Sequence, residues 1–114
     1  MASRTSSPLV HPGVAELDLF AVMTALADPV RRGIVVNLAQ KPGLSCNAFN
    51  ADSAASSLTR HFRVLREAGL IWQTDVGNRR ENVLRKDDLD SRFPGLMDMV
   101  IHEGLAADSD PVAI

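Results

Sequence analysis

The amino-acid sequence predicts a mainly α-helical domain with one small β-hairpin, and three observations support this fold class. Apolar residues recur at helical spacing on both sides of residues 70–85. Within that stretch, two short β-prone segments, 70–74 and 82–85, flank the turn sequence Val76-Gly77-Asn78-Arg79. Asp, Pro and Gly residues stand where helices would begin and end. We expect about five helices and a two-stranded hairpin in residues 14–104, with flexible tails at 1–13 and 105–114.

Three helices are expected before residue 50. Residues 16–27 have helical periodicity, and Asp28-Pro29 then starts a second helix because Asp caps free N–H groups and Pro suits the first helical position. Lys41-Pro42-Gly43 ends that helix. A short third helix is expected at residues 45–49, with Ser45 as its cap.

The next helix, residues 53–68, has two contrasting faces and ends at Gly69 in a left-handed C-cap. Leu58, Phe62 and Leu65 form an apolar face suited to a core. Hydroxyl and charged side chains occupy the opposite face and its flanks: Ser56, Ser57, Thr59, Arg60, Arg63 and Glu67. Hydroxyls and guanidiniums suit a phosphate-lined groove, so this segment is predicted to be a DNA recognition helix.

A helix-turn-helix followed by a hairpin predicts a winged helix-turn-helix fold. The last helical element starts at Asp87 and must break near Phe93, because Pro94 follows. Its apolar stripe exceeds what so small a core needs, so we expect it to form a twofold dimer interface with the first helix. The residues expected there are Leu17, Phe20, Phe93, Leu96, Met97, Val100 and Ile101. Alternatively, the last helix folds back on its own domain.

Charge is distributed unevenly along the 114 residues, whose net charge is −2. Residues 53–86 carry seven basic and three acidic side chains, whereas residues 87–114 carry one basic and seven acidic ones. The basic surplus therefore coincides with the expected DNA-binding elements. No apolar run is long enough for a transmembrane helix, and no secretory signal is visible. The lone Cys46 fits a reducing cytoplasm.

Three motifs together resemble the ArsR/SmtB family of winged-helix repressors. They are Ala27-Asp28-Pro29-Val30-Arg31-Arg32, Ser56-Ser57-Leu58-Thr59-Arg60-His61-Phe62 and Val64-Leu65-Arg66-Glu67-Ala68-Gly69-Leu70-Ile71. The resemblance covers about residues 17–101. It implies a homodimer that binds a palindromic operator on double-stranded DNA and is released when a ligand or metal binds.

The metal sites of that family are incomplete in this chain. Where metal-sensing members carry a Cys-x-Cys pair, this sequence has Ser45 and Asn47, with Cys46 alone between them. Asp98 and His102 share a helical face, as in members that bind zinc between their final helices, but further ligands are not evident. We therefore predict no metal and no cofactor, and the effector is not indicated.

The predicted DNA contacts lie on two elements. The recognition helix enters the major groove, where Arg60 is the candidate for a bidentate guanine contact, and the hairpin tip approaches the flanking minor groove. His61 either reaches DNA or packs against the protein. The full predicted set is Ser56, Ser57, Thr59, Arg60, His61, Arg63, Asn78, Arg79 and Arg80.

Two other classes of function were weighed against DNA binding. No phosphate loop, metalloprotease motif or nucleophile elbow is present, so an enzyme is not expected. A winged helix used for protein–protein contact is the alternative, although such domains lose the basic groove face that is kept here. A redox role for Cys46 is disfavoured because its neighbours supply no positive charge.

Overall fold

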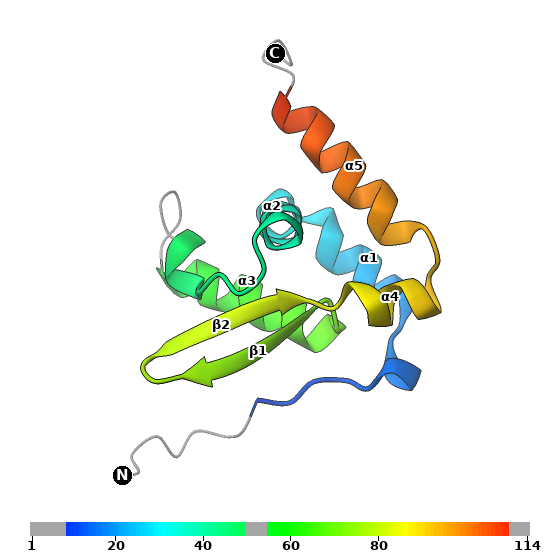
Figure 1. The fold of residues 1–114 in the computed structure, drawn as a ribbon. Coiled ribbons are helices and arrows are strands. Elements are labelled where there is room, and N and C mark those ends of the chain that lie inside the picture. The colour runs from blue at the N-terminus through cyan, green and yellow to red at the C-terminus, as the bar shows by residue number, and fades with distance from the viewer. Residues whose placement is uncertain (1–8, 50–54, 110–114) are drawn as a thin grey trace.

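The computed structural model of the chain describes residues 9–49 and 55–109. Helices precede and follow a single antiparallel hairpin, which forms the lower layer in Figure 1. The elements are η1 (Val14–Glu16), α1 (Leu19–Ala27), α2 (Pro29–Gln40), η2 (Cys46–Phe49), α3 (Ala55–Ala68), β1 (Ile71–Val76), β2 (Arg79–Leu84), α4 (Lys86–Arg92) and α5 (Leu96–Ser109).

Two aspartates set the starts of the first two helices. Asp28 Oδ1 accepts hydrogen bonds from Val30 N at 2.8 Å and Arg31 N at 3.2 Å, which confirms the predicted cap of α2. The single helix expected at residues 16–27 is replaced by a short 3-10 turn and α1. Leu17 between them is extended and buried, and Asp18 caps α1 by accepting from Phe20 N.

The core lies where α3 packs against α1 and α2. Leu58, Phe62 and Leu65 are all buried, which confirms the apolar face predicted for this helix. Burying each such side chain contributes about 1.5–3 kcal/mol. Because α3 is attached through this face, its opposite face is left toward solvent.

Gly69 makes the turn from α3 into the hairpin. Its φ is +87°, in the left-handed region that the sequence predicted for this position. A Cβ there would also collide with the side chain of Leu17. Both backbone conformation and space therefore call for glycine at this position.

The hairpin is longer than predicted, because β1 and β2 each extend to the turn. Val76 pairs with Arg79, so only Gly77 and Asn78 form the loop. Gly77 has φ +63° and no non-glycine residue described has a positive φ, as a type II′ turn requires. The opposite edge of β2 pairs with residues 43–45, an interaction that the sequence analysis did not anticipate: Asn82 N donates to Leu44 O and Gly43 N donates to Asn82 O.

Both chain ends differ from the predicted flexible tails. Residues 9–13 run along the hairpin and contact it, as Figure 1 shows, and residues 1–8 lie outside the described part. At the other end α5 continues to Ser109, beyond the expected boundary at 104. The last helix does break as predicted, between α4 and α5 around Pro94. None of the described helices is both long and apolar enough to cross a bilayer.

Candidate nucleic-acid interface

The outer face of α3 carries two guanidiniums for which the described part of the chain supplies no ion-pair or hydrogen-bond partner. Arg60 and Arg63 are exposed, and neither forms an ion pair or hydrogen bond with any described residue. Ser57 and Thr59 are exposed on the same helix, and the side chain of Ser56 lies outside what the structure describes. The guanidiniums of Arg60 and Arg63 can therefore contact a partner without first breaking an ion pair or hydrogen bond to any described residue.

His61 lies at the boundary between the two faces of α3 and is half-buried. Its Nδ1 is 3.3 Å from Nη1 of Arg31, whose Nε also donates to Ala25 O at 2.8 Å at the end of α1. Since a guanidinium can only donate, Nδ1 accepts and the neutral imidazole carries its proton on Nε2. The ring is thus held by α2 and retains one donor.

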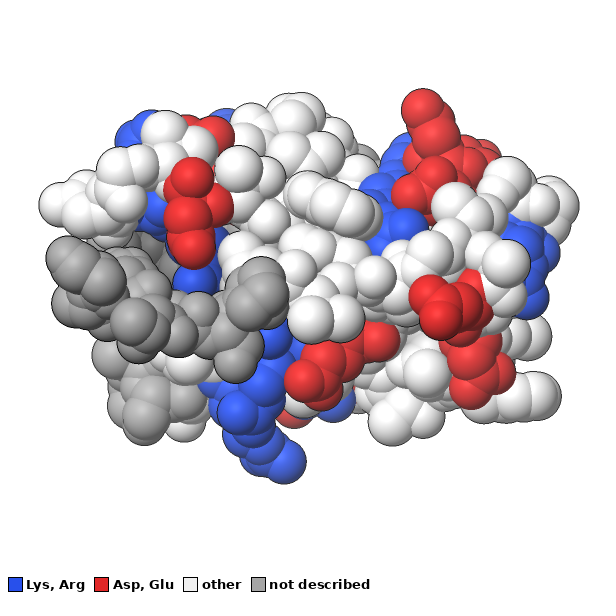
Figure 2. Space-filling model, turned by 90° about the horizontal axis from the view of Figure 1, so that it is seen from below, with Lys and Arg blue, Asp and Glu red and all other residues white. Residues whose placement is uncertain are grey.

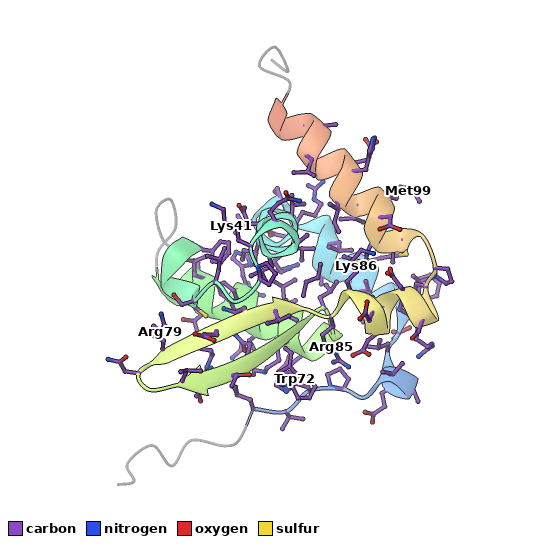
Figure 3. The ribbon with its side chains drawn as sticks, in the orientation of Figure 1. Lys41, Trp72, Arg79, Arg85, Lys86 and Met99 are labelled. Carbon is purple, nitrogen blue, oxygen red and sulfur yellow. The ribbon has the colours of Figure 1, made fainter. Side chains whose placement is uncertain are left out.

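The hairpin arginines, exposed Arg79 and half-buried Arg80, are paired with carboxylates of the same hairpin. Arg79 Nη2 lies 2.7 Å from Glu81 Oε2, and Arg80 Nε lies 2.8 Å from Asp75 Oδ1. The hydrogen bond from Arg80 to Asp75 raises the pKa of Arg80. Arg79 projects near the hairpin tip in Figure 3, and Asn78 in the turn is exposed. Pairing in such exposed positions is weak, so these cations stay available to an incoming anion.

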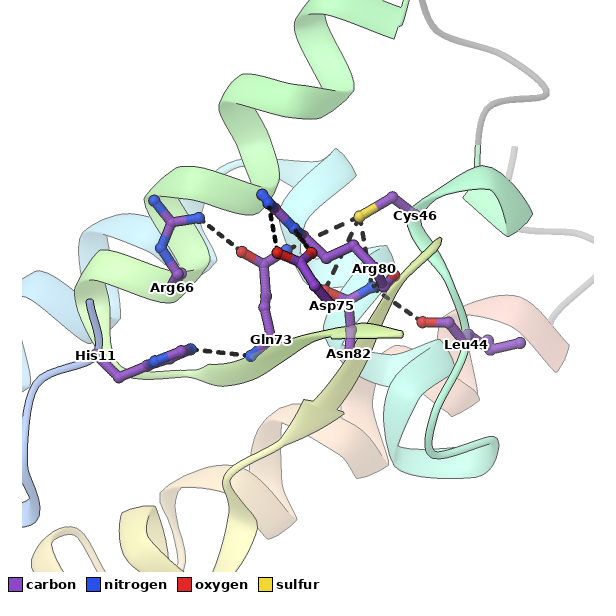
Figure 4. Close-up of polar contacts among 8 residues, drawn as sticks. All are labelled: His11, Leu44, Cys46, Arg66, Gln73, Asp75, Arg80 and Asn82. Carbon is purple, nitrogen blue, oxygen red and sulfur yellow. Dashed lines mark hydrogen bonds and ion pairs between the residues drawn. The ribbon is translucent and has the colours of Figure 1, made fainter. Parts of the chain in front are cut away.

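A buried polar network connects the hairpin to α3, as Figure 4 shows. Arg66 Nη1 donates to Gln73 Oε1 at 2.7 Å, and Gln73 Nε2 donates to Asn82 Oδ1 at 2.8 Å. Asn82 Nδ2 in turn donates to Leu44 O at 2.9 Å and lies 3.5 Å from Cys46 Sγ. Of this network, the sequence analysis had singled out only Cys46. The polar residues Gln73 and Asn82 sit on the inward side of the strand alternation, which is the signal that could have revealed them.

The residues predicted for dimerisation divide into buried, exposed and partly buried groups. Leu17 and Met97 are 3% and 0% exposed, so they belong to the core of the chain itself. Phe20 is 70% exposed, whereas Phe93, Leu96, Val100 and Ile101 are partly buried against the core. Three further exposed apolar side chains lie on α1 and α5 but were not predicted: Met23, Met99 and Leu105. In Figure 3, Met99 lies on the side of α5 that faces away from α2.

The two candidate metal ligands are otherwise engaged or isolated. Asp98 Oδ1 accepts from Lys86 Nζ at 2.9 Å, and His102 is exposed with Glu103 as its neighbour. Within the described ranges, no three His, Cys, Asp or Glu side chains are grouped so that they could hold a metal ion.

Basic and acidic side chains are interspersed on the face that Figure 2 shows, which is the underside of Figure 1. Carboxylates of α4 and α5 form ion pairs with some of these basic side chains. Arg85 Nε is 3.0 Å from Asp88 Oδ2, and Lys86 Nζ is 2.7 Å from Asp90 Oδ2. Some of the basic side chains of residues 53–86 are therefore paired with carboxylates, and others are not.

Comparisons with known proteins agree with this architecture. A helix-turn-helix domain model matches residues 26–73. The crystal structure of an ArsR-family transcriptional regulator superposes with a TM-score of 0.59 at 22% identity, covering 80% of this chain and 97% of that one. The crystal structure of a possible transcriptional regulator for arsenical resistance gives 0.56 at 28% identity, covering 81% and 98%. No curated protein matches significantly.

The helix-turn-helix match ends within β1, and the hairpin completes the winged helix that the solved structures share. Together, the helix-turn-helix match and the two superpositions support a DNA-binding regulator whose winged helix-turn-helix fold is similar to that of ArsR-family proteins.

Proposed function

We propose that the protein is a homodimeric repressor that reads a palindromic operator with α3 and the hairpin. The observation that carries this proposal is the pair of unengaged guanidiniums on the solvent-facing side of a helix whose other side is anchored in the core. A rigid helix with free donors on one face is what insertion into the major groove requires. Repression follows if the operator overlaps a promoter, because the bound protein then blocks polymerase.

In this proposal α3 supplies both base and phosphate contacts. Arg60 donates two hydrogen bonds to guanine O6 and N7, and Arg63 contacts the backbone. Ser56, Ser57 and Thr59 contribute hydroxyls to phosphates or base edges. Because Arg31 already contacts Nδ1 of His61, the ring keeps Nε2 as its donor, which favours a phosphate contact.

The hairpin supplies contacts to the neighbouring minor groove. Asn78, Arg79 and Arg80 lie at or next to the two-residue turn. Negative potential in a narrow minor groove would draw Arg79 and Arg80 away from Glu81 and Asp75. These contacts add affinity without reading individual bases.

Dimerisation is proposed through the exposed apolar side chains of α1 and α5, chiefly Phe20, Met23 and Met99. Phe93, Leu96, Val100 and Ile101 form the partly buried base of this surface. Two copies related by a twofold axis would present two recognition helices to successive turns of DNA. The regulator would act in the cytoplasm, in line with its single cysteine.

The proposal is tested by measuring oligomeric state and DNA binding on the same samples. Light scattering should give a dimer, and fluorescence anisotropy should show saturable binding to DNA from upstream of the protein's own gene. Phe20→Asp should produce a monomer with at least tenfold weaker operator binding, whereas Val30→Asp on α2 should remain dimeric. A monomeric wild-type protein without affinity for any duplex at low salt would overturn the proposal.

A further inference from the structure

The N-terminal segment 9–13 is fastened to the hairpin through His11 and Pro12. The imidazole of His11 stacks on Trp72, with ring centroids 3.9 Å apart and planes 9° apart. Its Nε2 accepts a hydrogen bond from Gln73 N at 2.9 Å. Arg85 Nη1 donates to Pro12 O at 2.7 Å, and its guanidinium lies 5.2 Å from the Trp72 ring centroid. Figure 3 shows Trp72 and Arg85 in the same part of the hairpin.

Gln73 connects this segment to the recognition helix. Its backbone N–H points away from β2, and His11 supplies the acceptor at this otherwise open strand edge. Its side chain, which is 3% exposed, accepts from Arg66 of α3 and donates to Asn82 of β2. Figure 4 shows the continuous path from His11 through Gln73 to Arg66.

We propose that His11 is a positioning residue for DNA binding, holding β1 and, through Gln73, the angle between the hairpin and α3. This role builds on the DNA-binding function proposed above. It requires an unprotonated Nε2, because a protonated imidazole has no acceptor to offer Gln73 N. In the neutral ring that accepts here, the proton sits on Nδ1.

The charged groups that face His11 make protonation unfavourable in this position. They are Arg66 from α3 and Arg85 from the segment after β2, the latter paired with Asp88 of α4. Burial, and then these two cations, lower the pKa of His11 from the ordinary value of 6.5. Because the docked state has the lower pKa, docking is fully stable above about pH 6.5 and is progressively lost as the pH falls through the lowered value.

The contact itself can be observed without DNA, because Trp72 is the single tryptophan of the chain. Tryptophan fluorescence of wild-type protein should change on acidification, with a midpoint below about pH 6.5. His11→Gln keeps a neutral acceptor and should lack this step. His102→Gln, which removes an exposed histidine on α5, should titrate like wild type.

Coupling to α3 can also be measured without DNA. In ¹⁵N-resolved NMR spectra, the amides of Gln73 and Arg66 should shift with the same midpoint as the fluorescence, and these shifts should vanish in His11→Gln. An unchanged fluorescence step in His11→Gln, or an α3 that does not respond to the titration, would overturn the positioning role.

Operator affinity gives the functional arm of the test. At pH 7.5, His11→Ala should bind about threefold to tenfold more weakly than wild type, the range expected for one lost hydrogen bond. His11→Gln should recover most of this loss. The ratio of wild-type Kd to His11→Gln Kd should rise between pH 7.5 and 5.5, because the two proteins differ only at residue 11. Equal binding by His11→Ala and wild type, with a pH-independent ratio, would contradict the proposal.

The two possible failures can be told apart. If no variant binds any duplex while fluorescence and NMR titrate as expected, the DNA-binding function fails and the His11–Gln73–Arg66 coupling stands. If wild type binds its operator but His11 variants leave affinity and spectra unchanged, only the positioning role fails.

Discussion

Helix α3 and the hairpin each carry two arginines at the surface, but they hold them in different states. Arg60 and Arg63 on α3 form no ion pair or side-chain hydrogen bond with the described residues, whereas Arg79 and Arg80 on the hairpin each pair with a carboxylate. A free guanidinium gains the whole energy of a new contact with phosphate or guanine. A paired one must first give up its partner, so it gains less.

The size of this difference is modest because the hairpin pairs are exposed. Surface ion pairs contribute about 0–1 kcal/mol, since water already stabilises both charges. The hairpin arginines can therefore exchange a carboxylate for a phosphate, but we expect α3 to dominate both affinity and base preference. The net charge of each segment does not distinguish paired from unpaired arginines. It therefore does not reveal that α3 should contribute more to DNA binding than the hairpin.

The largest expected effect concerns the face that anchors α3. Phe62→Ala should lower the free energy of unfolding by about 3–5 kcal/mol, because it removes a fully buried ring and leaves a cavity. Chemical denaturation monitored by circular dichroism measures this change. Met99→Ala, at an exposed site on α5, should stay within about 0.5 kcal/mol of wild type at low protein concentration. A small effect at Phe62 would mean that α3 is not held as described.

The next largest effect concerns the exposed face of α3. Arg60→Ala should weaken operator binding by about 1–3 kcal/mol and relax the preference at one base pair. Competition binding with single-base variants of the operator measures both quantities. Arg32→Ala, which removes an exposed arginine from α2, is the matched control and should have less effect.

A smaller effect is expected at the cap of α2, a helix that packs against α3. Asp28→Ala should cost about 0.5–2 kcal/mol of stability, since two N–H groups lose their acceptor. Burial alone would raise the pKa of Asp28, but the hydrogen bonds from Arg31 and Val30 lower it overall. The cap is therefore intact above about pH 3.8 and is lost as pH falls through the lowered value. Acid unfolding curves of wild type and Asp28→Ala that are fully separated above about pH 3.8 and converge as the pH falls further would support this account.

The smallest effects are expected on the hairpin. Arg79→Ala should weaken binding to all sequences alike and reduce the slope of log affinity against log salt by about 1. Glu81→Gln frees Arg79 and should strengthen binding by no more than about fivefold, the equivalent of one exposed ion pair. If Arg79→Ala cost more than Arg60→Ala, the ranking of the two elements would be wrong.

Local signals in the sequence were sufficient to predict the helix-turn-helix and the hairpin turn. Asp28-Pro29, the apolar face of Phe62 and its neighbours, and Gly77-Asn78 each act over a few residues, and each was found as expected. Contacts between distant segments were not predictable in this way. Residues 43–45 pair with β2, and residues 9–13 contact β1. Both contacts join segments that are distant in the sequence, so they depend on the tertiary fold.

The candidate site shows the same division. Exposure of Arg60 and Arg63 follows from helical periodicity. The pairing of Arg79 with Glu81 follows from the period of two along a strand, which places both on one face, although the sequence analysis did not use it. By contrast, burial of Leu17 and Met97 depends on how α1 and α5 pack, which periodicity alone does not specify.

Parallel titrations of Arg60→Ala and Arg79→Ala on one selected operator duplex, repeated on scrambled DNA, would decide between the two elements. The contacts described here predict that Arg60→Ala loses about tenfold or more on the operator and much less on scrambled DNA, whereas Arg79→Ala loses a smaller, equal factor on both. Identical losses for the two variants on both duplexes would show that the free guanidinium of α3 does not read sequence.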